Sequence, residues 1–187
     1  VRTRWPSPNP PHEMPCRKFV THLMLAEETR IWRADIDAAA MSIAPAGALN
    51  SLTQTLLRLT CPGVPDLYQG CDLWDFSLVD PDNRQPVDYV PRLAALESEA
   101  SPANLIEQWR NGYIKQYLIR KTLGLRNANP ALFSRGNYEP LQVDGVHAER
   151  VIAFTRRHQG YWLIVVMPRL AANLLGESDI PLVPPAH

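Results

Sequence analysis

The stretch "CPGVPDLYQGCDLWDFSLVDPDNRQPVDY", Cys61 to Tyr89, separates two segments with helical hydrophobic patterns. It holds six aspartates and one arginine, Arg84. Pro62-Gly63 should end the preceding helix, because proline cannot continue the helical hydrogen bonds and glycine permits a chain reversal. Residues 64–68 ("VPDLY") are predicted as a short strand, followed by an irregular loop as far as Pro91. A loop of this length is typically functional or disordered, and its apolar side chains argue against disorder.

Helical patterns lie on both sides of this stretch. Leucines recur at steps of three and four residues before Pro62 and predict a helix there: Leu49, Leu52, Leu56 and Leu59. A long helix is predicted over 104–126, in which Asn104 and Glu107 would form a capping box. Its predicted buried face consists of Ile106, Trp109, Tyr113 and Tyr117.

The N-terminal region begins with residues 1–15, which contain five prolines and are predicted as an extended loop. Residues 16–40 hold good helix formers without glycine or proline and are predicted as one helix. Its expected buried stripe is Phe19, Val20, Leu23 and Met24.

The pattern changes near Pro130 from helical to alternating. Three short strands are predicted from "YEPLQVD", "RVIAFTR" and "YWLIVVM". Asp144-Gly145 and Gln159-Gly160 are turn signals between them, so we expect an antiparallel meander.

Composition excludes some classes of partner. Lys+Arg and Asp+Glu are both 19 in 187 residues, so the formal charge is zero and gives no reason to expect a nucleic acid or an anionic membrane. No apolar run approaches the roughly 20 residues that cross a bilayer. Three cysteines in no metal-ligand spacing favour reduced thiols in the cytoplasm. The chain does not start with Met and ends after three strands, so we expect the natural protein to be longer.

The order helix, Pro-Gly stop, short strand, long loop, helix is typical of the last unit of a (β/α)8 barrel. The predicted fold class is therefore an α/β fragment, mostly helical, with the end of such a barrel in 1–130 and the beginning of a C-terminal antiparallel β domain in 131–187. In these barrels, loops at the C-terminal ends of strands build the active site. Tyr68 and Gln69 would then lie at the mouth of the strand, with the aspartates on the rim.

The sequence alone leaves three interpretations of the acidic loop open: a sugar site, a structural turn and a calcium site. Carboxylates and a guanidinium beside Trp74 and Tyr89 suit a sugar site, because hydroxyls need polar partners and pyranose faces pack on aromatic rings. Aspartate and asparagine also bind their own backbone, so "DPDN" could be only a turn. A calcium site is the third reading, but the Asp-x-Asp-x-Asp-Gly pattern is absent. We expect no metal and no cofactor.

Four segments resemble the maltooligosyl trehalose synthase family of the α-amylase superfamily (glycoside hydrolase family 13). They are "WPSPNP" (Trp5 to Pro10), "GALNSLTQTLLRLTCPGVPD", "PGVPDLYQGCDLWDFSLVDPDNRQPVDY" and "YLIRKTLGLRNANPALFSRGNYEPL". The block Asp80 to Asp88 is specific to the family, whereas Gly63 to Gly70 is shared across the superfamily. The chain departs from the family pattern at Cys71-Asp72, where Thr-Glu is usual, and at Gln85, where a second Arg is common.

The resemblance implies an intramolecular transglucosylation in trehalose biosynthesis: the reducing-end α-1,4 linkage of a maltooligosaccharide is converted to an α,α-1,1 linkage. The nucleophile, the acid/base and the third carboxylate of the superfamily would all precede this chain, so no catalytic residue is assigned. The fragment alone would be inactive. Superfamily relatives with an Asp-x-x-x-Arg-x-Pro element place its arginine beside the glucose pocket, which implies this role for Arg84. The expected substrate-binding residues are Tyr68, Gln69, Asp80, Asp82, Arg84 and Asp88.

Other functions stay open from the sequence alone. Arg84 could serve only to pin its own loop through Asp80 or Asp82. The chain could be a non-catalytic carbohydrate-binding or structural module, or part of an α-1,4-glucan hydrolase of the same superfamily. Open helix faces and strand edges would also allow the fragment to self-associate.

Overall fold

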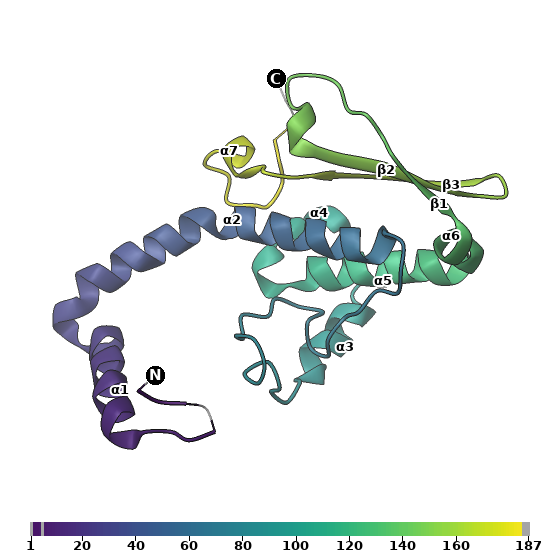
Figure 1. Ribbon diagram of the computed structural model, residues 1–187. Coiled ribbons are helices and arrows are strands. Elements are labelled where there is room, and N and C mark those ends of the chain that lie inside the picture. Colours follow the sequence, from purple (N-terminus) through teal and green to yellow (C-terminus); the bar gives the residue numbers. More distant parts are fainter. Residues whose placement is uncertain (1, 5, 185–187) are drawn as a thin grey trace. The chain divides into compact units, whose positions relative to one another are not determined.

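The computed structural model describes residues 2–4 and 6–184 (Figure 1). Trp5, which begins the first segment of family resemblance, lies outside the described residues. The chain divides into two compact units, one up to Ala44 and one from Pro45 onward.

The first unit is helical. Helix α1 (Pro10–Leu25) is followed by a 3-10 turn, η1 (Glu27–Thr29), and by the start of α2 (Arg30–Thr60). The prediction of an extended loop over 1–15 is wrong from Pro10 onward. Prolines suit the first turn of a helix, because the amide hydrogens there need no helical partner.

The single helix predicted over 16–40 is interrupted at Ala26, whose backbone is extended. Side chains of α2 and η1 hold this corner: Arg33 Nη1 donates to the Ala26 carbonyl at 2.6 Å, and Thr29 Oγ1 donates to the Leu23 carbonyl at 2.8 Å. The break therefore depends on contacts between helices, which the local sequence does not reveal.

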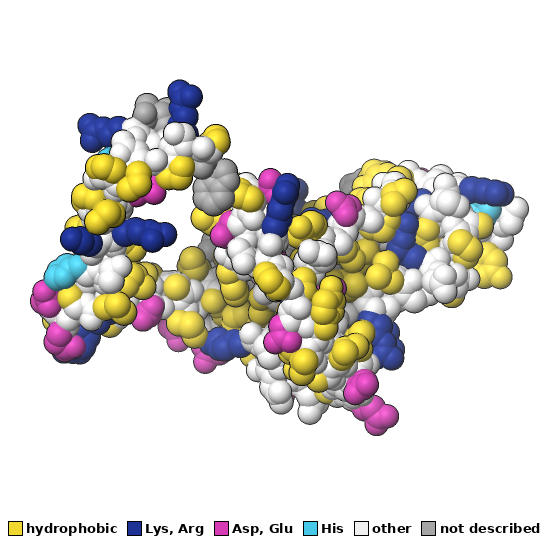
Figure 2. Space-filling model, turned by 90° about the horizontal axis from the view of Figure 1, so that it is seen from below, with side chains coloured by type: hydrophobic (Ala, Val, Ile, Leu, Met, Phe, Trp, Pro, Cys, Tyr) yellow, Lys and Arg dark blue, Asp and Glu magenta, His cyan; other side chains and the backbone are white. Residues whose placement is uncertain are grey.

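The predicted buried stripe of α1 is also wrong. Phe19, Val20 and Met24 are exposed, Leu23 is half-buried, and α1 has no buried residue. One helix and part of a second form no closed core, so apolar side chains stay at the surface. Figure 2 shows many exposed hydrophobic side chains on one face of the molecule.

The second unit contains the rest of α2, which ends at Thr60 as the Pro62-Gly63 signal predicts. The leucine-rich helix of the sequence analysis is this C-terminal half, continuous with the first half through Pro45. A residue far along the chain caps the C-terminus of α2: Arg126 Nη1 donates a hydrogen bond to the Leu59 carbonyl at 2.8 Å. A cation at a helix C-terminus is favourable because the helix dipole is negative there.

Residues 64–68 form no strand, which contradicts the sequence prediction. They belong to an irregular segment from Cys61 to Asp88. The sheet of the described residues contains only β1, β2 and β3, so residues 64–68 have no neighbouring strand in it. Pro65 also lacks the amide hydrogen that a ladder requires.

Four helices and a 3-10 turn follow the irregular segment: α3 (Tyr89–Glu97), α4 (Pro102–Glu107), η2 (Trp109–Asn111), α5 (Tyr113–Ala128) and α6 (Pro130–Arg135). The helix predicted over 104–126 is therefore divided at Gly112, whose φ is 80°. Ser101, rather than Asn104, caps the first part by accepting a hydrogen bond from the Asn104 amide. Of the predicted buried face, Trp109 is buried, whereas Ile106, Tyr113 and Tyr117 are only half-buried. The buried apolar side chains of α4 and α5 are Leu105, Ile114 and Ile119.

The predicted antiparallel meander is confirmed. Strands β1 (Asn137–Pro140), β2 (Val151–His158) and β3 (Tyr161–Pro168) pair in this order, with a 3-10 turn, η3 (Ala148–Arg150), before β2. Helix α7 (Ala172–Leu175) follows β3. Phe154, Val165 and Met167 pack against Leu56 and Leu57 of α2, so this face of the sheet lies on the helices (Figure 1).

Arg156 of β2 joins the sheet to the ends of two helices. Its side chain is 1 % exposed and donates to the carbonyls of Thr60 at 3.0 Å, Phe133 at 2.9 Å and Gly136 at 3.0 Å. Burial lowers the pKa of its guanidinium, and nearby Arg126 acts in the same direction. The C-terminal carbonyls of α2 and α6 compensate the buried cation in place of a carboxylate.

No helix in the described ranges is both long enough and apolar enough to span a membrane.

Candidate functional site

The acidic loop, residues 61–88, has two parts that differ in burial. Residues 70–74, which we call the anchored part, are half-buried. Residues 75–88, the outer part, are mostly exposed. The six aspartates are therefore not equivalent, and the contacts of each part decide what its side chains can do.

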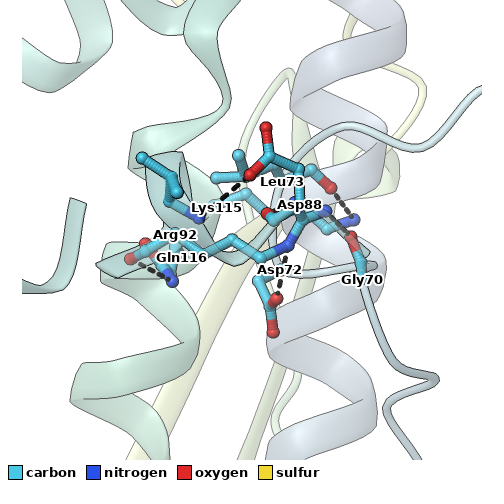
Figure 3. A network of polar contacts seen from close by, with 8 residues as sticks. Gly70, Asp72, Leu73, Asp88, Arg92, Lys115 and Gln116 are labelled. Atoms are coloured by element: carbon cyan, nitrogen blue, oxygen red, sulfur yellow. Dashed lines mark hydrogen bonds and ion pairs between the residues drawn. The ribbon is translucent and has the colours of Figure 1, made fainter. Parts of the chain in front are cut away.

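Arg92 of α3 holds the anchored part (Figure 3). Its Nε lies 3.0 Å from Asp72 Oδ2, its Nη1 donates to the Asp88 carbonyl at 2.7 Å, and its Nη2 donates to the Gly70 carbonyl. One guanidinium thus ties together the two ends of the 70–88 segment. The planar fork of arginine suits this role because it presents several donors in fixed directions.

Two side chains of α5 also hold the anchored part and Arg92 in place. Gln116 Nε2 donates to the Arg92 carbonyl at 3.1 Å, and Lys115 Nζ donates to the Leu73 carbonyl at 3.0 Å. Figure 3 shows these side chains converging on the anchored part of the loop. Burial lowers the pKa of Lys115, while nearby Cys71, Asp75 and Asp72 oppose that shift.

An aromatic pair completes the anchor. The Trp74 Nε1 donates to the Trp109 carbonyl at 2.6 Å, and the two rings meet edge to face at 6.3 Å. Gly112 allows this close approach, because a Cβ there would lie 2.9 Å from the Trp74 backbone nitrogen. The left-handed conformation of Gly112 independently favours glycine.

The outer part carries Arg84 and Asp80 as an ion pair. Arg84 Nη2 donates to Asp80 Oδ2 at 3.0 Å, and Arg84 Nε donates to Asp80 Oδ1. Their side chains are 65 % and 58 % exposed. These two bonds use Nε and Nη2, so among the described contacts the donors on Nη1 remain for another acceptor. The pair therefore presents an oriented guanidinium at the surface.

Three other aspartates bind the backbone. Asp82 Oδ2 accepts a hydrogen bond from the Leu78 amide at 2.7 Å, and Asp88 caps α3 by accepting from the Val90 amide at 3.0 Å. Asp75 Oδ1 accepts a hydrogen bond from the Ser77 amide at 2.9 Å. Hydrogen bonds from the side chain and the backbone of Ser77 lower the pKa of the Asp75 carboxyl. Much of the acid in the loop thus serves turns and a helix cap, which is the turn reading of the sequence.

Comparison with known proteins gives the family. No family model matches the chain. Proteins from two strains of Mycobacterium tuberculosis, provisionally named maltooligosyl trehalose synthases, are 41 % identical over 125 residues, or 67 % of this chain and 14 % of theirs. A crystal structure of a maltooligosyl trehalose synthase matches 90 % of this chain and 22 % of that chain with a TM-score of 0.72 and 28 % identity. The enzyme from Arthrobacter ramosus matches 94 % of this chain and 22 % of that chain, with a TM-score of 0.70 and 31 % identity.

The chain belongs to the maltooligosyl trehalose synthase family. It spans about a seventh of the curated relatives it matches, and 22 % of each solved structure. The resemblance identified from the sequence is thereby confirmed. The helical structure with a small three-stranded antiparallel sheet agrees with a part of such an enzyme.

Within this family member, the structure brings some of the expected binding residues together and separates others. Asp80 and Arg84 are paired, whereas the carboxylates of Asp82 and Asp88 are turned to backbone amides. Tyr68 and Gln69 are exposed and precede the turn at Gly70, where the Cys71 amide donates to the Tyr68 carbonyl.

Arg92 is the residue that sequence reasoning missed. The available signal was its spacing, since it lies four residues after Asp88 in the first turns of α3. Its contact with Asp72, however, is made over 20 residues of chain. Such a tertiary contact has no local pattern in the sequence.

Metal binding finds no support in the parts of the chain that the structure describes. No group of three or more His, Cys, Asp or Glu side chains in 2–4 and 6–184 could hold an ion. Cys16, Cys61 and Cys71 are free thiols, and burial raises the pKa of the Cys71 thiol.

Proposed function

We propose that the chain is part of an intramolecular transglucosylase that converts the reducing-end α-1,4 linkage of maltooligosaccharides to an α,α-1,1 linkage. Relatives named maltooligosyl trehalose synthase, found by both sequence and structure, support this assignment. Residues 1–130 would form the C-terminal end of a catalytic (β/α)8 barrel, and residues 131–187 would begin the C-terminal β domain. We place the enzyme in the cytoplasm.

In this proposal the chain supplies part of the substrate site rather than the reacting groups. Net anomeric retention uses two carboxylates about 5–5.5 Å apart, one as nucleophile and one as acid/base. Neither is assigned to this chain. Water must also be excluded, because it would hydrolyse a glycosyl-enzyme intermediate.

The observation that carries the proposal is the exposed pair of Arg84 and Asp80 on a loop whose base is fixed by Arg92. The pair holds the guanidinium in one orientation while donors on Nη1 remain for a sugar hydroxyl. Tyr68 and Gln69 would extend this polar surface, and Asp82 and Asp88 would contribute by shaping the backbone.

Product analysis tests the reaction. The full-length protein that contains this chain should be incubated with maltopentaose, and its products should be separated and assayed for reducing ends. Transglucosylation predicts a product of unchanged size without a reducing end. Glucose or maltose as the main product would instead indicate a hydrolase, and unchanged maltopentaose would favour a non-catalytic module.

A further inference from the structure

The two ends of the 70–88 segment meet at the base of the acidic loop. Gly70 has a φ of 87°, and a Cβ at this position would lie 3.1 Å from Val87 Cγ2 and 3.6 Å from Arg92 Nη2. The left-handed conformation and this close approach both favour glycine. The segment therefore leaves the base and returns to it at nearly the same point.

Above this base, the outer part of the loop is held together by its own hydrogen bonds. The Asp82 amide donates to the Val79 carbonyl at 3.0 Å, and the Arg84 amide donates to the Pro81 carbonyl at 3.1 Å. Among the described residues, every hydrogen bond of 75–87 has both partners inside the loop. These bonds give the outer part its shape but do not fix it to a helix or a strand.

Arg92 is the side chain that fixes the base (Figure 3). It is 16 % exposed, against 65 % for Arg84. Its donors reach Asp72 and the Gly70 carbonyl at one end of the segment and the Asp88 carbonyl at the other. A guanidinium can hold both ends at once because its donors point in several fixed directions, whereas an ammonium is a compact point charge. Lysine at this position would therefore not reproduce the same set of contacts.

We infer that Arg92 is a positioning residue for saccharide binding, and that it acts on Arg84 through the base of the loop. The inference rests on the proposed function, in which Arg84 binds a sugar hydroxyl. Each of the three nitrogens of the Arg92 guanidinium already donates within the chain. Arg92 thus sets where the loop carries Arg84, and Arg84 makes the contact with the substrate.

This role differs from a general contribution to stability in a way that kinetics can resolve. A contact with a non-reacting hydroxyl is made in the bound substrate and in the transition state alike, so disturbing it should raise KM and leave kcat nearly unchanged. A residue that acts through Arg84 should also lose its effect on KM once Arg84 is removed. A residue that only stabilised the fold would have the same effect with or without Arg84.

A double-mutant cycle in the full-length protein, with maltopentaose as substrate, tests the inference. Arg92→Lys should raise KM about tenfold, while kcat stays within about threefold of the wild type. In the Arg84→Ala background, the same substitution should change KM by less than about twofold. Arg120→Lys is the matched control, since Arg120 of α5 donates to the Leu96 carbonyl near the other end of α3 at 2.7 Å. The control should change neither kcat nor KM.

Asp72→Asn replaces Arg92→Lys in the cycle if the lysine variant does not fold. It leaves the bonds from Arg92 to the two carbonyls in place, so it should raise KM by a smaller factor and again only when Arg84 is present. The inference is overturned if the folded variant leaves KM unchanged, if it lowers kcat alone, or if it raises KM equally in both backgrounds. In each of these cases the wild type still forms a non-reducing product, so the proposed function stands. A wild type that does not convert maltopentaose contradicts the proposed function, and the inference falls with it.

Discussion

The Nε of Arg92 lies 3.0 Å from the carboxylate of Asp72, and the same guanidinium binds the carbonyls of Gly70 and Asp88. These contacts fix both ends of the 70–88 segment of the acidic loop to the start of α3. The exposed ion pair of Arg84 and Asp80 lies in the loop between these two anchored ends. The orientation of Arg84 therefore depends on a residue that lies outside the loop.

Replacing Arg92 should release the loop. Arg92→Ala removes hydrogen bonds to a carboxylate and to two carbonyls, at a cost of about 2 kcal/mol. Hydrogen exchange should become faster across residues 70–88. Arg30→Ala is the control, because Arg30 forms an exposed ion pair with Glu27 and such pairs contribute little. Equal exchange across residues 70–88 in both variants would contradict the anchoring role.

Gly112 should tolerate no side chain. Gly112→Ala places a Cβ 2.9 Å from the Trp74 nitrogen and forces a left-handed conformation on alanine, so we expect a loss of more than about 2 kcal/mol. Gly124→Ala, in the interior of α5 with nothing within 4 Å of the new Cβ, should instead stabilise by about 0.5–1 kcal/mol. Denaturant unfolding measures both variants, and the same sign of change in both would refute the close-approach argument.

Arg156 should be essential for joining the sheet to the helices. Arg156→Met leaves the carbonyls of Thr60, Phe133 and Gly136 without their buried donor, which should cost at least about 3 kcal/mol. Arg169→Met is the matched control, since Arg169 is exposed. Similar melting temperatures for the two variants would show that the buried guanidinium is dispensable.

Lys115 gives the stability a pH dependence of defined sign. Burial lowers its pKa in the folded chain below the unfolded value of about 10.4. Between these two values the unfolded chain binds more protons, so this contribution to stability rises with pH and is complete above about pH 10.4. The free energy of unfolding of the wild type, relative to that of Lys115→Met, should therefore increase as the pH approaches 10. Cys61 and Cys71, whose pKa values are raised, act in the opposite direction in both proteins. Because Lys115 lowers the pKa of Cys71, this opposing effect is no larger in the wild type than in Lys115→Met. A constant difference across this range would contradict the burial effect.

The local parts of the fold were predictable from the sequence. Alternating side chains and the turn at Gln159-Gly160 predicted the meander, and Pro62-Gly63 predicted the end of α2. Both signals act over a few residues. Residues 64–68 failed as a strand because a strand needs neighbours, and local composition does not provide them. Gly112 divided a predicted helix because its conformation serves a contact with the distant Trp74.

The acidic loop stays a predicted site, and the contacts that hold this loop could not be predicted from the sequence. The abundance of aspartate and the single Arg84 drew attention to the loop, and the family resemblance implied that the loop binds substrate. The sequence did not separate Asp80, which orients Arg84, from Asp82 and Asp88, which serve the backbone. Arg92 and Lys115 act through contacts across 20 and 42 residues of chain, which only the folded structure reveals.

The kinetics of Arg84→Ala in the full-length protein, measured beside its melting temperature, test the central claim most directly. Arg30→Ala serves as the control, because it also removes an arginine from an exposed ion pair. If Arg84 binds the saccharide, its loss should lower kcat/KM for maltopentaose at least about tenfold, while the melting temperature changes no more than in the control. Unchanged kinetics with a lowered melting temperature would show that Arg84 only pins its own loop.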